Sequence, residues 1–546
     1  MHGCISRINS LPKTCGKIYT LPEGQRQGNR KMAAVRFCIA VTGRTQYLAD
    51  DSGQRLRGVG PGSYAIDRPG TLLMIRQLRT SRWLAVFVLL LYLAFPLHAH
   101  AFSIGEERKL GERLLFSVRK EFPVLDDPDI SQYINALGKK VLETVGPQYF
   151  EYRFFVVKSK QFNAFAAPAG LVFFYTGLIE AMRTEDQLLS VLAHEIGHVV
   201  SRHIAQRLDK GTKISALSLL AAIAGIALGV PGLSEGLMAG SMAAGQAVNL
   251  QYSRENEEQS DRLSFGWMQQ MRRDPSAMEE MLRSMRRITR YHIGSEVPQY
   301  LLTHPNPEAR LDYVQSLLEL ARQQGRAQQY VKTDNFGFLR FKYRVLAQSM
   351  DLDALRTYCV TTAASATEKE QQIMARYGLA LVEGENRNHD EALRQLAAVQ
   401  EQYPQKDILE TDRAVLLMDS GRYEEARHTL EQMFKRDPNN IYGVYQLSKI
   451  EMMSGNNVRA EQLLQRVAIA MPEYPQVYFD LGQIEANRGR EGVGGFYLGK
   501  YNLYRGKIKI ARQYLVRAGK DKKVPEKMRA EARAILEQLK ELDKES

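Results

Sequence analysis

Residues 187–204 read QLLSVLAHEIGHVVSRHI, and apolar residues recur through this stretch at helical spacing. His194 and His198 stand four residues apart, so both imidazoles lie on one helix face and can bind a single ion. Glu195 projects nearby but off that line, where it can accept a proton from a water molecule. Zinc lowers the pKa of its water ligand to about 7, which gives a nucleophile at neutral pH. The stretch therefore predicts a zinc-binding helix equipped for hydrolysis.

A surface helix that happens to carry two histidines is the alternative interpretation. Ala193 and Gly197 are small, as close packing around a metal requires. An apolar face that would bury the helix is supplied by Leu188, Val191, Leu192 and Val199. These neighbours favour the metal site.

A catalytic zinc site needs a third protein ligand, and the stretch SRENEEQSDR at residues 253–262 offers Glu255, Glu257 and Glu258. Chemistry alone does not choose among the three. Glu257 shares a helix face with Asp261, so one carboxylate can bind zinc while the other orients a ligand imidazole. An acidic, solvated helix face is the alternative.

Two further histidines lie near these motifs. His304 stands in THPNP, a rigid loop before the helix that contains Arg310. It is either an exposed loop residue or a fourth zinc ligand that keeps the site latent. His203, which follows His198 by five residues, is either a surface residue of the helix or a partner of a ligand.

The order of elements predicts an α+β unit over residues 102–322, mostly helical with a small sheet. Helical patterns cover residues 105–122, 131–145, 185–208, 255–290 and 307–323, and strand patterns cover 152–157 and 171–175. A linker is expected at residues 323–340.

Residues 341–546 carry an internal repeat with a step of 34 residues, the period of tetratricopeptide units. Its markers are Ala392, Ala426 and Ala460; Gly421, Gly455 and Gly489; and Pro404, Pro438 and Pro472. We expect the Ala and Gly positions to let two helices pack closely, and Pro to end the second helix. Stacked units form an all-α solenoid with a concave binding face, although a purely structural role is the alternative.

The first 101 residues read as a leader. Residues 74–101 combine a basic start, an apolar run shorter than the ~20 residues of a membrane span, and a small-x-small site that ends at Ala101. We expect cleavage after Ala101 and export to the periplasm, with an uncleaved anchor as the alternative. Residues 1–73 show no pattern, and we expect Met74 to be the true start, with the preceding stretch an over-extended reading frame.

Charge and cysteine content exclude some classes of function. The net charge of +13 comes mostly from the leader, which holds 14 Lys and Arg against 4 Asp and Glu; the rest holds 60 against 57. Nucleic-acid binding therefore gains no support. Cys359 is the only cysteine after residue 101, so neither an internal disulfide nor a thiolate zinc site is expected.

The stretch from Ile214 to Val230, ISALSLLAAIAGIALGV, is apolar and at the lower limit of length for a membrane span. We expect a helix hairpin over the active site that touches the membrane surface or a partner. Burial within the domain is the alternative.

The motifs His194-Glu195-x-x-His198, Glu257-x-x-x-Asp261 and His304-Pro305 with Arg310 resemble those of the gluzincin metallopeptidases of the HtpX and CAAX-prenyl-protease type. Asn163, Ala164 and Phe165 resemble that family's strand beside the substrate cleft. With the leader and the repeats, the chain is similar over nearly all of residues 102–520 to the periplasmic BepA/YfgC-like branch, the β-barrel assembly-enhancing proteases.

The resemblance implies one Zn²⁺ per chain bound by His194, His198 and Glu257, with Glu195 as general base. It also implies that Asp261 supports the ligands, that His304 is a regulatory fourth ligand and that Arg310 lies in the cleft. The implied role is assembly and quality control of outer-membrane β-barrel proteins. Misassembled clients would be degraded, and the repeats would dock on the β-barrel assembly machinery.

A second hypothesis is a non-proteolytic tetratricopeptide scaffold with a latent or structural zinc site. An intact Glu195 favours the protease, because a structural site needs no general base. His304 is consistent with the scaffold, because a fourth protein ligand closes a zinc site to water. A prenyl-protein protease is disfavoured because the sequence lacks multiple membrane spans.

Overall fold

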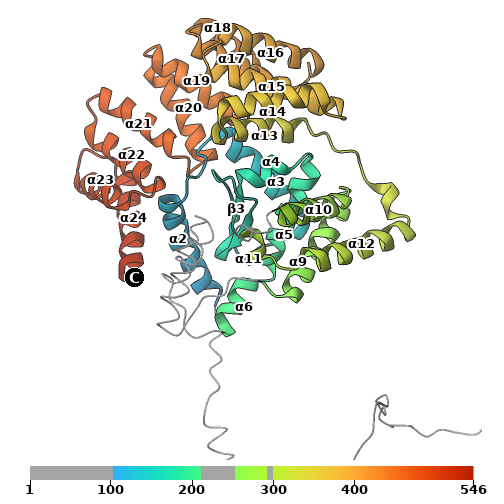
Figure 1. The fold of residues 1–546 in the computed structure, drawn as a ribbon. Coiled ribbons are helices and arrows are strands. Elements are labelled where there is room, and N and C mark those ends of the chain that lie inside the picture. The colour runs from blue at the N-terminus through green and yellow to red at the C-terminus, as the bar shows by residue number, and fades with distance from the viewer. Residues whose placement is uncertain (1–102, 211–251, 292–298, 545–546) are drawn as a thin grey trace, which may run out of the picture. The chain divides into compact units, whose positions relative to one another are not determined.

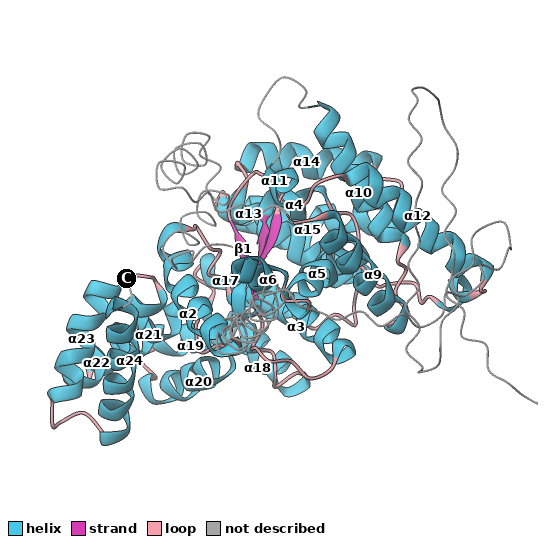
Figure 2. Ribbon diagram, turned by 90° about the horizontal axis from the view of Figure 1, so that it is seen from below, coloured by secondary structure: helices cyan, strands magenta, loops and turns pink. Residues whose placement is uncertain are grey.

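The computed structural model describes residues 103–210, 252–291 and 299–544. The predicted leader and the stretch from Ile214 to Val230 lie outside the described residues. All of the described residues belong to one unit, residues 98–546. In the described part of the chain, no helix is long and apolar enough to cross a membrane. Helices dominate, around one small sheet (Figure 2).

The sheet has three strands in the order β1-β3-β2. The strands predicted at residues 152–157 and 171–175 are present as β1 (Arg153–Val157) and β3 (Leu171–Tyr175). β1 runs parallel to β3, and β2 (Ala164–Ala167) runs antiparallel to β3. The turn from β2 to β3 places Ala169 and Gly170 at positive φ, which fits glycine better than alanine. Because the strand order is β1-β3-β2, β2 lies at an edge of the sheet.

Alternation of side chains along the strands gives the sheet two apolar faces. One face, which includes Phe155 and Phe173, packs on α2 (Ile104–Glu121). The other, which includes Phe174, packs on α3 (Pro128–Val145) and α5. Figure 1 shows α2 and α5 on opposite sides of β3. Burial of each Phe or Leu stabilises the folded state by about 1.5–3 kcal/mol, so the sheet supports α5 rigidly.

Helix α5 (Glu185–Val200) carries the His-Glu-x-x-His motif and is buried almost throughout. It begins at Thr184, whose side chain accepts a hydrogen bond from the Gln187 amide. The helix predicted at residues 185–208 is in fact two, because Arg202 adopts a left-handed conformation (φ 52°) and α6 (His203–Lys210) starts anew. The break turns His203 back toward α5.

The remaining helices of this half are α4 (Thr176–Ala181), α9 (Arg254–Gln270), α10 (Ser276–Tyr291), α11 (Gln299–Thr303) and α12 (Pro307–Gln323). The helix predicted at residues 255–290 is two helices, α9 and α10, since Arg272 has a φ of 56° between them. This turn lets α9 and α10 pack separately on α5 and α12.

The linker predicted at residues 323–340 is shorter than expected. α12 continues to Gln323, and α13 (Phe336–Ser349) starts before residue 340, with only a short 3-10 turn at Arg326–Gln329 between them. The Thr333 hydroxyl donates to Asp186 Oδ2 at 2.8 Å, and Asn335 Oδ1 accepts from the Glu185 amide at 2.9 Å. The linker is thus hydrogen-bonded to the first turn of α5, which local composition does not reveal.

Residues 352–544 fold as antiparallel helix pairs, the tetratricopeptide pattern. The helices are α14 (Leu352–Ser365), α15 (Lys369–Glu385), α16 (His389–Gln402), α17 (Ile408–Asp419), α18 (Tyr423–Arg436), α19 (Ile441–Met453), α20 (Asn457–Ala470), α21 (Pro475–Asn487), α22 (Glu491–Tyr504), α23 (Ile508–Lys520) and α24 (Glu526–Lys544).

The repeat markers have two different roles. Ala392, Ala426 and Ala460 are fully buried at helix–helix contacts, as predicted. The close packing predicted for Gly421, Gly455 and Gly489 is wrong, because a Cβ at any of them would meet nothing within 4 Å. Each instead ends a helix in the left-handed region, with φ between 72° and 78°.

Lys342 in α13 is buried and donates to the Met182 carbonyl at 2.7 Å. Burial lowers the pKa of its ammonium from 10.5 to about 8. The unfolded chain therefore binds more protons than the folded chain between pH 8 and 10.5, and this residue makes stability rise with pH in that window. Below pH 8 the buried charge costs about 3 kcal/mol.

We expect the difference in unfolding free energy between Lys342→Met and wild type to change by about 3 kcal/mol between pH 7 and pH 10.5, in favour of wild type at high pH. Urea denaturation of both proteins across this range measures it. A difference that stays constant with pH would contradict the buried charge.

Candidate metal centre

The two motif histidines of α5 point at one place. Their Nε2 atoms lie 3.0 Å apart, and both rings are buried. Two nitrogens this close, each with a lone pair available in the neutral ring, suit a shared cation. The predicted helix geometry is thus present.

Helix α9 brings the third residue because it lies close against α5. A Cβ on Gly197 would stand only 3.2 Å from Ser260 Cα, so glycine permits this approach. Glu257 then places Oε2 3.5 Å from His194 Nε2 and Oε1 3.5 Å from His198 Nε2. Of the three candidates left open by the sequence, Glu257 is buried while Glu255 and Glu258 are exposed.

His304 completes the group, and the alternative of an exposed loop histidine is wrong because the side chain is fully buried. It follows α11, where its amide donates to the Tyr300 carbonyl at 2.7 Å. Its Nδ1 lies 2.9 Å from Glu257 Oε1, and its Nε2 lies 3.5 Å from Glu195 Oε1. One ligand atom from each of His194, His198, Glu257 and His304 lies within 4.8 Å of the others.

The buried polar atoms around this point lack partners of their own. Both carboxylate oxygens of Glu195 and the Nε2 of His304 are buried, and none has a hydrogen-bond partner among the described residues. Buried carboxylates are paired or bind metal ions in folded proteins. The imidazole and carboxylate donors fit one Zn²⁺.

Asp261 and Arg310 stand behind the ligands. Asp261 Oδ1 is 2.9 Å from His194 Nδ1, on the side of the ring away from the ligand nitrogen. Arg310 donates from Nε and Nη2 to the two oxygens of Asp261, each at 2.8 Å, and its Nη1 lies 2.8 Å from Glu257 Oε2. A bidentate guanidinium fixes both carboxylates in orientation. Arg310 therefore lies behind the site and contacts two carboxylates.

These contacts shift the protonation equilibria of the site. Burial and Arg310 oppose protonation of His194, but Asp261 and Glu257 outweigh them and raise its pKa to about 9. Burial holds the pKa of His198 well below its usual value. Burial opposes ionisation of Glu257, but His304 and Arg310 prevail and hold its pKa well below the usual range. Glu257 is therefore an anion, as a ligand must be.

His203 and Gln259 form a second set of contacts. His203 Nδ1 is 3.0 Å from His198 Nδ1, and His203 Nε2 is 3.1 Å from Gln259 Oε1. The side chain of His203 is buried, so the alternative of a surface residue is wrong, and its neighbour is His198. Gln259 was missed by sequence reasoning, and no local signal marks it, since it reaches His203 only after α9 packs on α5.

The residues expected at the substrate strand begin β2. Asn163, Ala164 and Phe165 are all buried, Ala164 toward α5 and Phe165 toward α2. Their side chains therefore lie in the core, and a substrate could reach this segment only through its backbone. Among the described strands, β2 pairs on one side only, so its outer backbone edge has no strand partner there.

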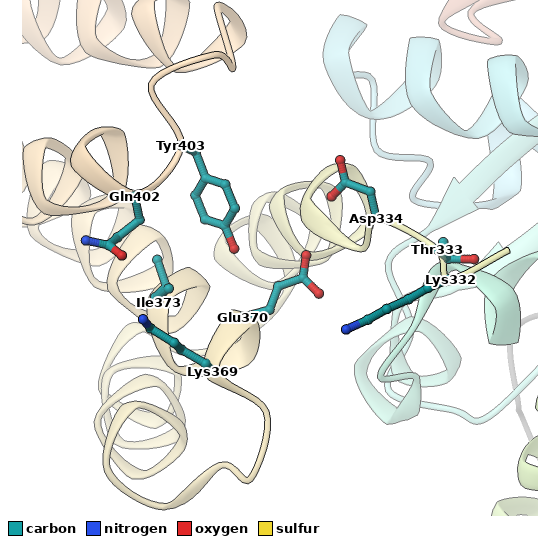
Figure 3. A pocket seen from close by; sticks show the side chains of 8 residues that line it. All are labelled: Lys332, Thr333, Asp334, Lys369, Glu370, Ile373, Gln402 and Tyr403. Atoms are coloured by element: carbon teal, nitrogen blue, oxygen red, sulfur yellow. The ribbon is translucent and has the colours of Figure 1, made fainter.

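A surface hollow of about 430 Å³ lies elsewhere, between the linker and helices α15 and α16 (Figure 3). It is lined by Lys332, Thr333, Asp334, Lys369, Glu370, Ile373, Gln402 and Tyr403. None of these belongs to the metal group, so the hollow has no part in the chemistry of that group.

Residues 128–318 match peptidase family M48, and residues 385–447 and 417–481 match the tetratricopeptide repeat. The chain is 25% identical over 382 residues to the beta-barrel assembly-enhancing protease of Yersinia pestis, covering 69% of this chain and 70% of that one. It is 28% identical over 345 residues to the protein of that name from Escherichia coli K12, covering 62% of each. Less than two thirds of the latter protein is therefore spanned.

Another relative matches a shorter part of the chain. The mitochondrial metalloendopeptidase OMA1 of Schizosaccharomyces pombe is 27% identical over 191 residues, covering 35% of this chain and 53% of that one. The similarity to this relative thus extends over about a third of the chain, against more than 60% for the two bacterial proteins.

Proposed function

We propose that this chain is a periplasmic zinc endopeptidase acting on outer-membrane β-barrel proteins, because residues 128–318 match peptidase family M48 and the residues that follow match the tetratricopeptide repeat. It assists their assembly and degrades misassembled clients. The observation that most supports a protease is the buried Glu195, which has no hydrogen-bond partner among the described residues and lies beside four converging side chains that can bind a metal ion. The names of the bacterial relatives support the substrate class.

The proposed roles follow from the geometry. His194, His198 and Glu257 hold the ion, with Asp261 orienting His194. Zinc bound there supplies a Lewis acid and lowers the pKa of water to about 7. Glu195 takes the proton from the attacking water and delivers it to the leaving amine. Arg310 keeps Glu257 and Asp261 ionised and in place.

The outer edge of β2 is the proposed seat of the substrate. An extended peptide can add to a free sheet edge through main-chain hydrogen bonds, without regard to its sequence. Unfolded β-barrel proteins consist of such segments. The repeats, with their stacked helix pairs, are the proposed docking surface for the β-barrel assembly machinery.

His304 is proposed as the restraint on this activity. Its Nε2 lies 3.5 Å from Glu195 Oε1, and as a fourth protein ligand it would close the site to water. We expect His304→Ala to raise basal casein cleavage, by roughly tenfold if the closed form accounts for about nine molecules in ten. Unchanged or lower activity, with zinc retained, would refute the restraint.

The substrate class is tested by incubating the protein with an outer-membrane β-barrel protein, once unfolded in urea and then diluted, and once folded in detergent. We expect cleavage of the unfolded form only, and none by Glu195→Gln. If casein is cleaved but neither form of the barrel protein is, the assignment as a protease is supported and the proposed substrate class is refuted. N-terminal sequencing of the protein from a periplasmic extract should begin at Phe102.

The alternative is a scaffold in which the repeats act and the zinc site is latent. The position of His304 in the group favours this alternative, because four protein ligands are typical of a closed, structural zinc site. If neither the wild type nor His304→Ala cleaves casein while both hold zinc, the scaffold is correct.

A further inference from the structure

The two histidines proposed as zinc ligands have different partners behind them. His194 Nδ1 faces the carboxylate of Asp261 at 2.9 Å, a common arrangement for a zinc ligand. His198 Nδ1 instead faces another imidazole, the Nδ1 of His203, at 3.0 Å. The Nε2 of His203 in turn lies 3.1 Å from the side-chain oxygen of Gln259.

We propose that His203, held by Gln259, is a positioning residue that fixes His198 in the tautomer able to bind zinc. This rests on the zinc site proposed above and adds two residues to it. Neither His203 nor Gln259 belongs to the group of converging ligand atoms, so both act through His198.

The hydrogens on Gln259, His203 and His198 can be assigned one after another. The amide oxygen of Gln259 only accepts, so His203 Nε2 carries the hydrogen. A neutral imidazole has one such hydrogen, which leaves His203 Nδ1 as an acceptor. His198 Nδ1 must then be the donor, and its Nε2 is left with a bare lone pair, 3.0 Å from His194 Nε2.

The opposite arrangement is incompatible with metal binding. If the Gln259 amide were reversed, its NH₂ would donate to His203 Nε2, and His203 Nδ1 would donate to His198 Nδ1. His198 would then carry its hydrogen on Nε2, the atom directed at the ion. The orientation of one glutamine amide thus decides whether His198 is a ligand.

The fold holds the rings in this register. The left-handed turn at Arg202 brings His203 back to His198, and the Arg202 guanidinium pairs with Glu107 at 2.9 Å. The Tyr252 ring stacks on His198 with centroids 3.8 Å apart and meets His203 at 60°. His198 is thereby prevented from rotating away from its partner.

A neutral partner also has a chemical consequence. Asp261 adds negative charge behind His194, whereas His203 adds a hydrogen bond to His198 without charge. The site therefore gains orientation at His198 without a further anion beside its carboxylates, of which Arg310 already balances Glu257 and Asp261 in part.

The test compares His203→Leu with His203→Asn in the full chain. The Oδ1 of asparagine stands at the same bond separation from the backbone as the Nδ1 of histidine and accepts a hydrogen bond, whereas leucine does not. We expect His203→Leu to weaken zinc binding by about 10–100-fold, and His203→Asn to restore most of it. Competition with a fluorescent zinc chelator measures the dissociation constant, and the Tm of the metal-free protein reports the fold.

Variants of Gln259 form a second part of the test, and they do not disturb the core because this residue is exposed. We expect Gln259→Leu to weaken zinc binding and Gln259→Glu, which keeps an accepting oxygen, to do so less. Gln206→Leu is the matched control, an exposed glutamine of α6 that donates to the Ser201 carbonyl. If His203→Leu lowers the Tm of the metal-free protein, the Gln259 variants decide.

Wild-type zinc affinity in both His203→Leu and Gln259→Leu would overturn the inference, as would equal loss in His203→Leu and His203→Asn at unchanged Tm. Either result, with zinc bound and casein cleaved by the wild type, leaves the proposed function standing. A wild type that binds no zinc would instead refute the proposed function itself.

Discussion

We expect Glu195→Gln to abolish detectable cleavage of unfolded casein and to keep one zinc per chain. Glu195 is the only carboxylate of the site whose two oxygens both lack a hydrogen-bond partner among the described residues, so it is free to take a proton. Glutamine keeps the shape but has no basic oxygen. We expect the loss of general-base catalysis to lower the rate by about 10²–10⁴-fold. Gel assays of casein cleavage and metal analysis of the same preparation measure the two quantities.

Retention of zinc is the informative part of that experiment. Glu195 is absent from the group of ligand atoms within 4.8 Å of one another, so its replacement should leave the ion in place. Loss of zinc in Glu195→Gln would assign it the role of a ligand, and full activity would show that another group is the base. Glu258→Gln, a change in an exposed glutamate of α9, is the control for both outcomes.

The second large effect is expected at Glu257. We expect Glu257→Gln to weaken zinc binding by at least about a hundredfold, since the loss of a ligand exceeds the effect of losing a ligand's own partner. Glu258→Gln should bind zinc like the wild type. The two residues are neighbours of the same type, but Glu257 is buried against His304 and Arg310 whereas Glu258 is exposed. Zinc dissociation constants of the three proteins measure the difference.

If Glu257→Gln keeps wild-type affinity, the third ligand is another residue, and the contacts of Glu257 with His304 and Arg310 would be purely structural. If both variants lose zinc, the effect comes from a disturbed α9 and not from one carboxylate. The Tm of each metal-free protein separates these two cases.

The motif helix and the repeats could be predicted from the sequence because their signals are local. His194 and His198 lie one helical turn apart, and Ala and Pro recur at a visible step of 34 residues. The structure confirms the small sheet and the helical repeats in this order. Such features need no knowledge of the segments that pack against them.

Other features depend on contacts between distant segments. The sequence leaves Glu257 as one of three candidates. The close contact of Gly197 with Ser260 packs α9 against α5, and this packing distinguishes Glu257. His304 looked like a loop residue, and only the fold shows that it is buried. The break at Arg202 was missed because left-handed residues other than glycine carry no reliable sequence signal.

The linker was predicted too long for a related reason. Its polar composition suggested an exposed connection, yet Thr333 and Asn335 use those polar groups to bond the first turn of α5. The glycines at the repeat ends were assigned to packing when their positive φ is what requires them. In both places the residue type was informative and its role was decided by tertiary structure.

Metal dependence of proteolysis tests the central claim most directly. The wild-type chain is assayed on unfolded casein as purified, after zinc is removed with a chelator, and after one equivalent of zinc is restored. The buried group of His194, His198, Glu257 and His304 predicts activity in the first and third samples and none in the second. Cleavage that persists in the zinc-free protein would contradict the account.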